Sequence, residues 1–276
     1  MKNNRRNNNH HRNNQGKPNN KPHSKHDGHD NSKQPQPSLY GAHAVREAWL
    51  NPERNVEALY LTEQAAQSFD DVLREAKSKG LKRPSPTDVD KQKLEKMLPK
   101  GAVHQGIAML CAPLDDIFIQ DFIIKAESNP NSVLLMLDQV TDPHNVGAII
   151  RSASAFGAEG IIMQKKHAPA LEGVLAKTAC GGVEHIPVAY ETNLSRTLEE
   201  LKEHGFFTYG LDERGAMNIG DVPKDGKRVL VLGAEGSGLR RLVAENCDEL
   251  VKLPTKPPIA SLNVSNAAAV GLYALL

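Results

Sequence analysis

Two patterns of apolar and polar positions run along residues 132–276, and together they predict a sheet covered by helices. Continuous apolar runs predict buried strands at residues 133–138, 160–164, 186–189, 206–211, 228–232 and 249–253. Amphipathic segments with a helical period lie between them, at residues 145–156, 171–178, 194–203, 239–246 and 263–276. Because strands and helices alternate, the predicted fold class is α/β with a largely parallel sheet.

A smaller set of elements fills residues 38–113. Helices are predicted at residues 42–50, 68–78 and 88–98, and strands at residues 56–61 and 105–111. The pair Asn51-Pro52 ends the first helix, and Gly80 ends the second. Residues 114–131 are rich in turn-forming residues and predict a linker with one short helix. We therefore expect a small α/β domain over 38–113, a linker over 114–131 and a larger domain over 132–276.

Residues 1–37 form a polar segment that is rich in Asn, His, Lys and Arg and almost without apolar side chains. Such a composition cannot bury enough surface to offset chain entropy, so a disordered basic tail is predicted. The segment holds eight Lys and Arg against two Asp, a net charge of +6, which leaves −5 for the rest of a chain whose total is +1. A basic arm on an acidic body fits a nucleic-acid partner, and it equally fits a solubilising tail with no specific role.

Length and composition limit the class of protein. With 276 residues and 39% apolar content, the chain can form one or two domains with a substantial core. No apolar run approaches the roughly 20 residues that span a bilayer, and the polar amino terminus has no signal-peptide pattern, so we expect a cytoplasmic protein without membrane contact. The three cysteines are scattered, which predicts reduced thiols, and no metal site is expected from the His and Cys spacing.

Three short segments near the ends of predicted strands carry the candidate chemistry, and each also has an ordinary structural explanation. Asn145 stands where a helix should begin, as an N-cap does, and Arg151 would then be a surface side chain of that helix. The glycine-rich run 233–238 fits a strand-to-helix turn, and residues 261–263 fit a helix cap. No dinucleotide or P-loop glycine pattern is present, so a nucleotide-dependent oxidoreductase has no support.

Taken together and in this order, the segments 145–151, 232–239 and 253–267 resemble the three motifs of the SpoU-type RNA 2'-O-methyltransferases, a branch of the knotted SPOUT superfamily. The resemblance implies a trefoil knot within residues 132–276, S-adenosyl-L-methionine as cofactor and a homodimer through the knotted domain. Residues 39–45 and 104–108 are similar to the amino-terminal domain of the 23S rRNA members of the family. This second similarity implies an L30e-like domain over 38–113 that binds the substrate RNA.

The resemblance also assigns roles to individual residues. It implies the catalytic residues Asn145, Arg151, Glu235, Ser261 and Asn263, and a cofactor pocket lined by Gly233, Leu253 and Leu262. The family's arginine has been proposed as the general base, but a guanidinium with a pKa above about 12 rarely gives up its proton. We therefore expect Arg151 to contact the ribose or its phosphate, and Glu235 to orient Arg151 or Asn145. Pro257 replaces a glycine that the family usually has, which questions cofactor binding.

The function implied is S-adenosylmethionine-dependent 2'-O-methylation of a ribose, that of a guanosine in 23S rRNA. A resistance-type rRNA methyltransferase shares the layout and remains an alternative, as does a tRNA enzyme, although tRNA enzymes generally lack a domain like 38–113. A non-catalytic RNA-binding factor of ribosome assembly is an alternative of another class. Only Pro257 favours that alternative, and the joint presence of the candidate catalytic residues opposes it.

Overall fold

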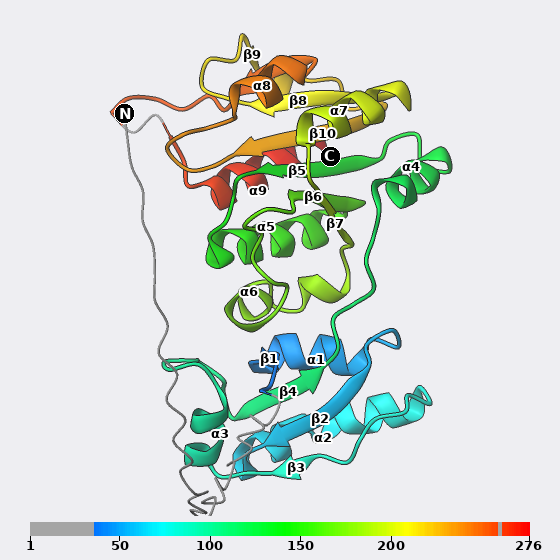
Figure 1. The fold of residues 1–276 in the computed structure, drawn as a ribbon, viewed down its shortest axis with the longest axis vertical. Coiled ribbons are helices and arrows are strands. Elements are labelled where there is room, and N and C mark those ends of the chain that lie inside the picture. The colour runs from blue at the N-terminus through cyan, green and yellow to red at the C-terminus, as the bar shows by residue number, and fades with distance from the viewer. Residues whose placement is uncertain (1–35, 259–260) are drawn as a thin grey trace, which may run out of the picture. The chain divides into compact units, whose positions relative to one another are not determined.

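Two β-sheets organise the residues that the computed structural model describes, which are 36–258 and 261–276 (Figure 1). The predicted tail over residues 1–37 therefore lies outside the described residues, except for its last two. The smaller sheet has the strand order β1-β4-β2-β3. Its strands are β1 (Leu39–Tyr40), β2 (Val56–Leu61), β3 (Thr87–Asp88) and β4 (Ile107–Cys111), and its helices are α1 (Ala42–Leu50), α2 (Glu63–Ser78) and α3 (Lys91–Met97).

Helix caps explain where this smaller region departs from the predicted bounds. The helix α2 begins before residue 68 because Thr62 caps it, with a hydroxyl that accepts the Ala65 N–H at 3.4 Å. The helix predicted at 88–98 begins later because the Asp90 carboxylate accepts the Lys93 N–H at 2.7 Å. The bounds of α1 and β2 are as predicted. The strands β1 and β3 comprise two residues each, too few for a periodic pattern to indicate them.

The larger sheet has seven strands in the order β7-β6-β5-β10-β8-β11-β9, and every neighbouring pair is parallel. Its strands are β5 (Val133–Asp138), β6 (Gly160–Gln164), β7 (Val188–Glu191), β8 (Phe206–Leu211), β9 (Met217–Asn218), β10 (Lys227–Gly233) and β11 (Glu249–Lys252). The prediction of an α/β fold with a parallel sheet is confirmed. Only the two-residue β9 was not predicted, because so short a strand leaves no pattern.

Helices cover both faces of this sheet (Figure 1). One face packs against α5 (Pro143–Phe156), α6 (Gly173–Thr178) and α9 (Val264–Leu275), and the other against α4 (Ile119–Glu127), α7 (Leu194–Glu203) and α8 (Arg241–Asn246). The six residues of β5 are all buried, with Leu135 and Leu137 in the first core and Leu134 and Met136 in the second. Burial on both faces is why this strand reads as one continuous apolar run.

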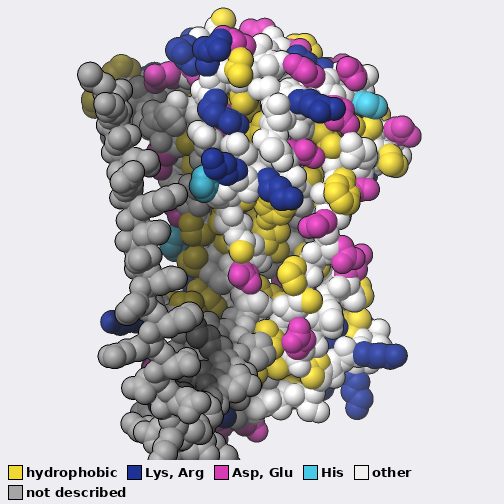
Figure 2. All heavy atoms as spheres, viewed as in Figure 1, with side chains coloured by type: hydrophobic (Ala, Val, Ile, Leu, Met, Phe, Trp, Pro, Cys, Tyr) yellow, Lys and Arg dark blue, Asp and Glu magenta, His cyan; other side chains and the backbone are white. Residues whose placement is uncertain are grey.

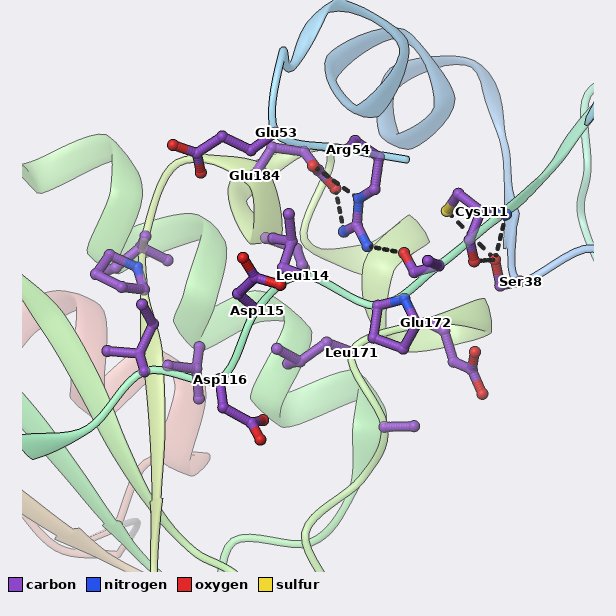
Figure 3. A pocket seen from close by; sticks show the side chains of 18 of the residues that line it. Ser38, Glu53, Arg54, Cys111, Leu114, Asp115, Asp116, Leu171, Glu172 and Glu184 are labelled. Atoms are coloured by element: carbon purple, nitrogen blue, oxygen red, sulfur yellow. Dashed lines mark hydrogen bonds and ion pairs between the residues drawn. The ribbon is translucent and has the colours of Figure 1, made fainter. Parts of the chain in front are cut away.

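A buried ion pair joins the smaller region to the larger one (Figure 3). The Arg54 guanidinium donates to both carboxylate oxygens of Glu184, at 2.7 and 3.1 Å, and Asn51 donates to the same carboxylate at 2.8 Å. Glu184 belongs to a short 3-10 turn, η1 (Gly182–Glu184), that packs on α1 and α5. The side chains of Arg54 and Glu184 are only 4% and 2% exposed. They line a cavity of about 530 Å³, which we call the inter-region cavity.

Charges of both signs share the surface of the described residues. On the face drawn in Figure 2, Lys and Arg side chains stand among Asp and Glu side chains. Charge alone therefore does not mark a site on the face shown. A second 3-10 turn, η2 (Ile219–Asp221), packs against α9.

Candidate active site

Three loops at the carboxyl ends of neighbouring strands enclose a cavity of about 670 Å³, which we call the loop cavity. Its lining residues come from 211–214 after β8, from 232–238 at the end of β10, and from 253–267 after β11. Parallel strands end at the same edge of a sheet, which is where ligands bind in such folds. The cavity gathers the predicted site residues Gly233, Glu235, Leu253, Ser261, Leu262 and Asn263.

Glycine at position 233 is required because the loop after β10 folds back on it. A Cβ atom at Gly233 would lie 2.1 Å from the carbonyl carbon of Gly238 and 2.4 Å from the nitrogen of Leu239. The returning part of the loop is fixed by the Gly238 N–H, which donates to the Ala234 carbonyl at 2.9 Å. The turn between them exposes Glu235 toward the cavity. The close approach at Gly233 is therefore made by the loop's own backbone, as the predicted strand-to-helix turn requires.

Two predicted residues from distant motifs meet beside the cavity, where Asn263 is among the described lining residues and Asn145 is not. The Asn263 side chain donates from Nδ2 to Oδ1 of Asn145 at 2.9 Å. The side-chain amide oxygen of Asn263 accepts the Ser265 N–H at 2.9 Å, so Asn263 caps α9 as predicted. The N-cap explanation for Asn145 is wrong, because Asp142 caps α5 and accepts the His144 N–H at 3.0 Å. Asn145 therefore lies inside the first turn, with its amide engaged by Asn263.

Arg151 is placed apart from the other candidates. It lies exposed on α5 and is not among the described residues that line the loop cavity. Gly182 of η1 packs against its backbone, since a Cβ there would lie 3.3 Å from the Arg151 Cα. The expected pairing with Glu235 does not occur within the described part of this chain, where neither side chain has a hydrogen bond or ion pair to the other. Both side chains are exposed, so they remain accessible to a bound ligand.

Asp212 is a cavity residue that the motif comparison missed. Its carboxylate is 7% exposed and accepts two bonds from the Arg214 guanidinium, both at 2.8 Å. The hydrogen bond from the Arg214 side chain is the largest cause that lowers the pKa of Asp212, so this carboxylate is ionised at neutral pH. The sequence did contain a signal for Asp212 as a site residue, because Asp212 directly follows the strand β8 at the ligand-binding edge of the sheet.

Pro257 and the cysteines contribute no group to the loop cavity. Pro257 is exposed and is absent from the described lining residues. Cys111 is buried, and desolvation raises the pKa of its thiol. Burial is also the main cause that raises the pKa of Cys247 to about 12. These two thiols therefore stay protonated at neutral pH, which makes them poor nucleophiles.

Among residues 36–258 and 261–276, no group of three or more His, Cys, Asp or Glu side chains is arranged to hold a metal ion. No described helix combines the length and the apolar character needed to cross a bilayer.

Comparison with known families assigns both regions of the chain. Residues 132–273 match the SpoU rRNA methylase family, and residues 38–116 match a family described as RNA 2'-O ribose methyltransferase substrate binding. The first match alone spans more than half of the 276 residues. The chain therefore belongs to the SpoU rRNA methylase family and is a methyltransferase of the SpoU/TrmH type.

Related proteins extend this assignment over most of the chain. A protein of Staphylococcus haemolyticus assigned to the TrmH family of tRNA/rRNA methyltransferases is 35% identical over 237 residues, which cover 85% of this chain and 93% of the relative. The TrmH-family protein YacO of Bacillus subtilis is 38% identical over 241 residues, with the same coverage. Both regions described above are thus shared with proteins of nearly equal extent.

Solved structures show the same fold. An AdoMet-bound rRNA methyltransferase from Sinorhizobium meliloti aligns with a TM-score of 0.70 at 20% identity, covering 87% of each chain. The SpoU methyltransferase AviRb from Streptomyces viridochromogenes, in complex with AdoMet, aligns with a TM-score of 0.68 at 23% identity, covering 86% of this chain and 88% of its own. The chain therefore shares its fold with these two methyltransferases, while the trefoil knot and the domain bounds stay predictions.

Proposed function

We propose that this methyltransferase uses S-adenosylmethionine to methylate a ribose 2'-hydroxyl of RNA, and that the loop cavity holds the cofactor. The observation that supports this most is the cavity itself, which gathers six residues that the SpoU motifs assign to the site. Its volume of about 670 Å³ suits a ligand of this size. Two structural neighbours were solved with AdoMet bound.

The charge and backbone of the loop cavity fit this cofactor. S-adenosylmethionine would supply an electrophilic methyl group on a positively charged sulfonium. Glu235 brings a carboxylate to the cavity, beside the Asp212 carboxylate that is paired with Arg214, and negative charge suits a cation in a partly enclosed site. The glycines of 233–238 expose backbone groups that can hydrogen-bond to an adenosine. Gly233, Leu253 and Leu262 are the residues that we propose to line the adenosine.

The remaining candidates would act on the RNA hydroxyl. Asn263 holds the carbonyl oxygen of Asn145, so the Asn145 NH₂ group can donate to a ribose oxygen. Ser261 is exposed at the cavity lining and can do the same. Arg151 would bind the ribose or its phosphate and stabilise the developing alkoxide, because a guanidinium stays charged. Glu235 would orient the arginine once RNA is bound.

We propose 23S rRNA as the substrate, modified at a guanosine in the cytoplasm. The match of residues 38–116 to a substrate-binding family supports an RNA-binding role for this region. The related proteins carry the description tRNA/rRNA, which keeps a tRNA enzyme and a resistance-type rRNA enzyme as alternatives. Pro257, the one residue that favours the non-catalytic alternative, is not among the described residues that line the loop cavity, which supports a catalytic role.

We further propose that two copies associate through an apolar patch on α5 and α9. Phe156, Val270, Tyr273 and Leu276 are exposed there, with Tyr273 71% exposed. The rings of Phe156 and Tyr273 lie 6.2 Å apart, and Val270 is one helical turn from Tyr273. Exposed apolar patches of this kind mark association sites. The wild-type protein should sediment at twice the mass of one chain, and Tyr273→Lys should sediment as a monomer; a monomeric wild type would reject the proposal.

One assay tests the proposed reaction. Labelled S-adenosylmethionine is supplied with unmodified 23S rRNA, 16S rRNA or bulk tRNA, and the RNA is then digested to locate the label. We expect label on one 23S ribose, and its loss in Arg151→Ala with cofactor binding retained. Label on tRNA alone would overturn the substrate, label on a base would overturn the ribose specificity, and absence of label with RNA bound would favour the non-catalytic alternative.

A further inference from the structure

A fully buried carboxylate lies beside the loop cavity without belonging to its lining. Asp138 is the last residue of β5 and its side chain is 0% exposed. It pairs in register with Gly233, the last residue of β10. Its two oxygens accept the Arg240 backbone N–H at 2.8 Å and the Arg240 Nε–H at 2.7 Å. Both bonds thus go to a single residue on the far side of the glycine-rich loop.

These two bonds close the loop whose turn forms one wall of the cavity. The loop leaves the sheet at Gly233, which the parallel pairing of β10 with β5 holds in place. It returns at Leu239, which is buried in the core below, and Arg240 follows at the start of α8. Asp138 therefore fixes the returning end of the loop to the same strand that fixes the leaving end.

Stability alone gives a weak reason for a charge at this position. Removing a carboxylate from water costs several kcal/mol, which a partner largely offsets, and well-packed apolar residues often serve stability equally well. What an ion pair adds is a defined relative orientation of its two side chains, because a carboxylate and a guanidinium meet in few geometries. Here that orientation fixes Arg240 relative to β5, and with it the returning end of residues 234–238. The Arg240 side chain is 38% exposed, so its exposed part stays on the loop surface while Nε is held.

We infer that Asp138 and Arg240 are a positioning pair that sets the cofactor-binding shape of the loop 233–238. This inference rests on the proposed function, since it assigns the loop to S-adenosylmethionine. It parallels the bond from Asn263 to Asn145, which connects the third motif to the first. The Asp138–Arg240 pair connects the end of β5 to the residue that directly follows the second motif segment. Neither of these two side-chain contacts requires a ligand.

The test measures cofactor affinity in the full-length protein by calorimetry, using S-adenosylmethionine itself. Asp138→Asn keeps the size of the side chain and removes its charge, and Arg240→Gln removes the Nε donor. We expect each to weaken cofactor binding about tenfold, and the double variant to be no weaker than the worse single, because contacting residues are not additive. The KM for S-adenosylmethionine should rise accordingly, while kcat at saturating cofactor and the affinity for RNA change less than about threefold.

A matched control separates positioning from general destabilisation. Glu184→Gln removes the charge of another buried ion-pair carboxylate, 2% exposed, that lies outside the loop cavity. It should lower the melting temperature and leave the cofactor affinity unchanged. If Asp138→Asn fails to fold, Arg240→Gln alone tests the inference, because the Arg240 side chain is partly exposed and its replacement is better tolerated. Wild-type affinity in a folded Arg240→Gln protein would overturn the inference only. A wild-type protein that binds no S-adenosylmethionine would overturn the proposed function as well.

Discussion

Polar groups line both cavities of this molecule, and the inter-region cavity also has an ion pair whose two side chains are both buried. In the inter-region cavity, the Arg54 guanidinium bonds to Glu184 and to the Ala112 carbonyl, and Ser38 bonds to Cys111 (Figure 3). In the loop cavity, Glu235 and Ser261 lie exposed at the lining. Groups bonded within the chain fix its structure, whereas exposed groups at a rim can bind a ligand. The buried Arg54–Glu184 pair therefore marks the inter-region cavity as a structural joint, although Glu53 and Asp115 are exposed at its lining.

The largest expected effect is a loss of stability caused by a substitution in the inter-region cavity. Arg54→Ala should lower the free energy of unfolding by roughly 3–5 kcal/mol, because it leaves the Glu184 carboxylate buried without its cation. Denaturant unfolding measures this loss. The affinity for S-adenosylmethionine should stay at the wild-type value below the unfolding transition. If the cofactor affinity of the folded variant fell together with its stability, the two cavities would be coupled.

The second prediction concerns the loop cavity alone. Asn263→Asp keeps the oxygen that accepts the Ser265 N–H but cannot donate to Asn145. We expect kcat to fall by roughly 10²-fold, as for other side chains that orient a reacting group, with the melting temperature nearly unchanged. Asn263→Ala removes the cap as well and should lower stability by about 1 kcal/mol. Full activity in Asn263→Asp would show that the contact between Asn263 and Asn145 has no part in catalysis.

A third variant tests the close approach within the loop. Gly233→Ala places a methyl group 2.1 Å from the Gly238 backbone, so the loop must shift. Cofactor affinity should fall about tenfold, because backbone that is displaced cannot keep its contacts. Gly220→Ala is the matched control, since a Cβ at Gly220 meets no atom within 4 Å. Equal affinities for the two variants, measured by calorimetry, would contradict the role given to the loop.

The smallest expected effect is a pH dependence at the contact between the two regions. Burial would raise the pKa of Glu47, but hydrogen bonds from His185 and Arg46 outweigh it and hold the pKa below its usual 4.5. A carboxylate with a lowered pKa contributes stability above pH 4.5, and that contribution is lost as the pH falls through its folded pKa. In Glu47→Gln, the free energy of unfolding should therefore fall less steeply as the pH drops below 4.5, and the difference from wild type should be under about 1 kcal/mol. Thermal unfolding below pH 4.5 measures this, and the same pH dependence in both proteins would contradict the prediction.

Elements with a long periodic pattern were predicted well, and those defined by a cap or a single contact were not. The strands β5, β6 and β8 and the helices α1 and α7 have the predicted bounds, because burial on defined faces dictates their residues. The first turn of α5 was misplaced, since either Asp142 or Asn145 can cap a helix and only the fold selects one. Short strands such as β9 exist only through their neighbours in the sheet.

The sequence by itself determined the fold class, the family and eight candidate site residues, six of which meet in the loop cavity. Those follow from apolar periodicity and from three local motifs, which are properties of short segments. Only the tertiary structure decided that Asp212 joins the cavity, that Arg151 lies outside it, and that Asp138 holds Arg240. Such facts depend on which strand ends become neighbours, and residues 138 and 240 become neighbours only when β10 pairs with β5.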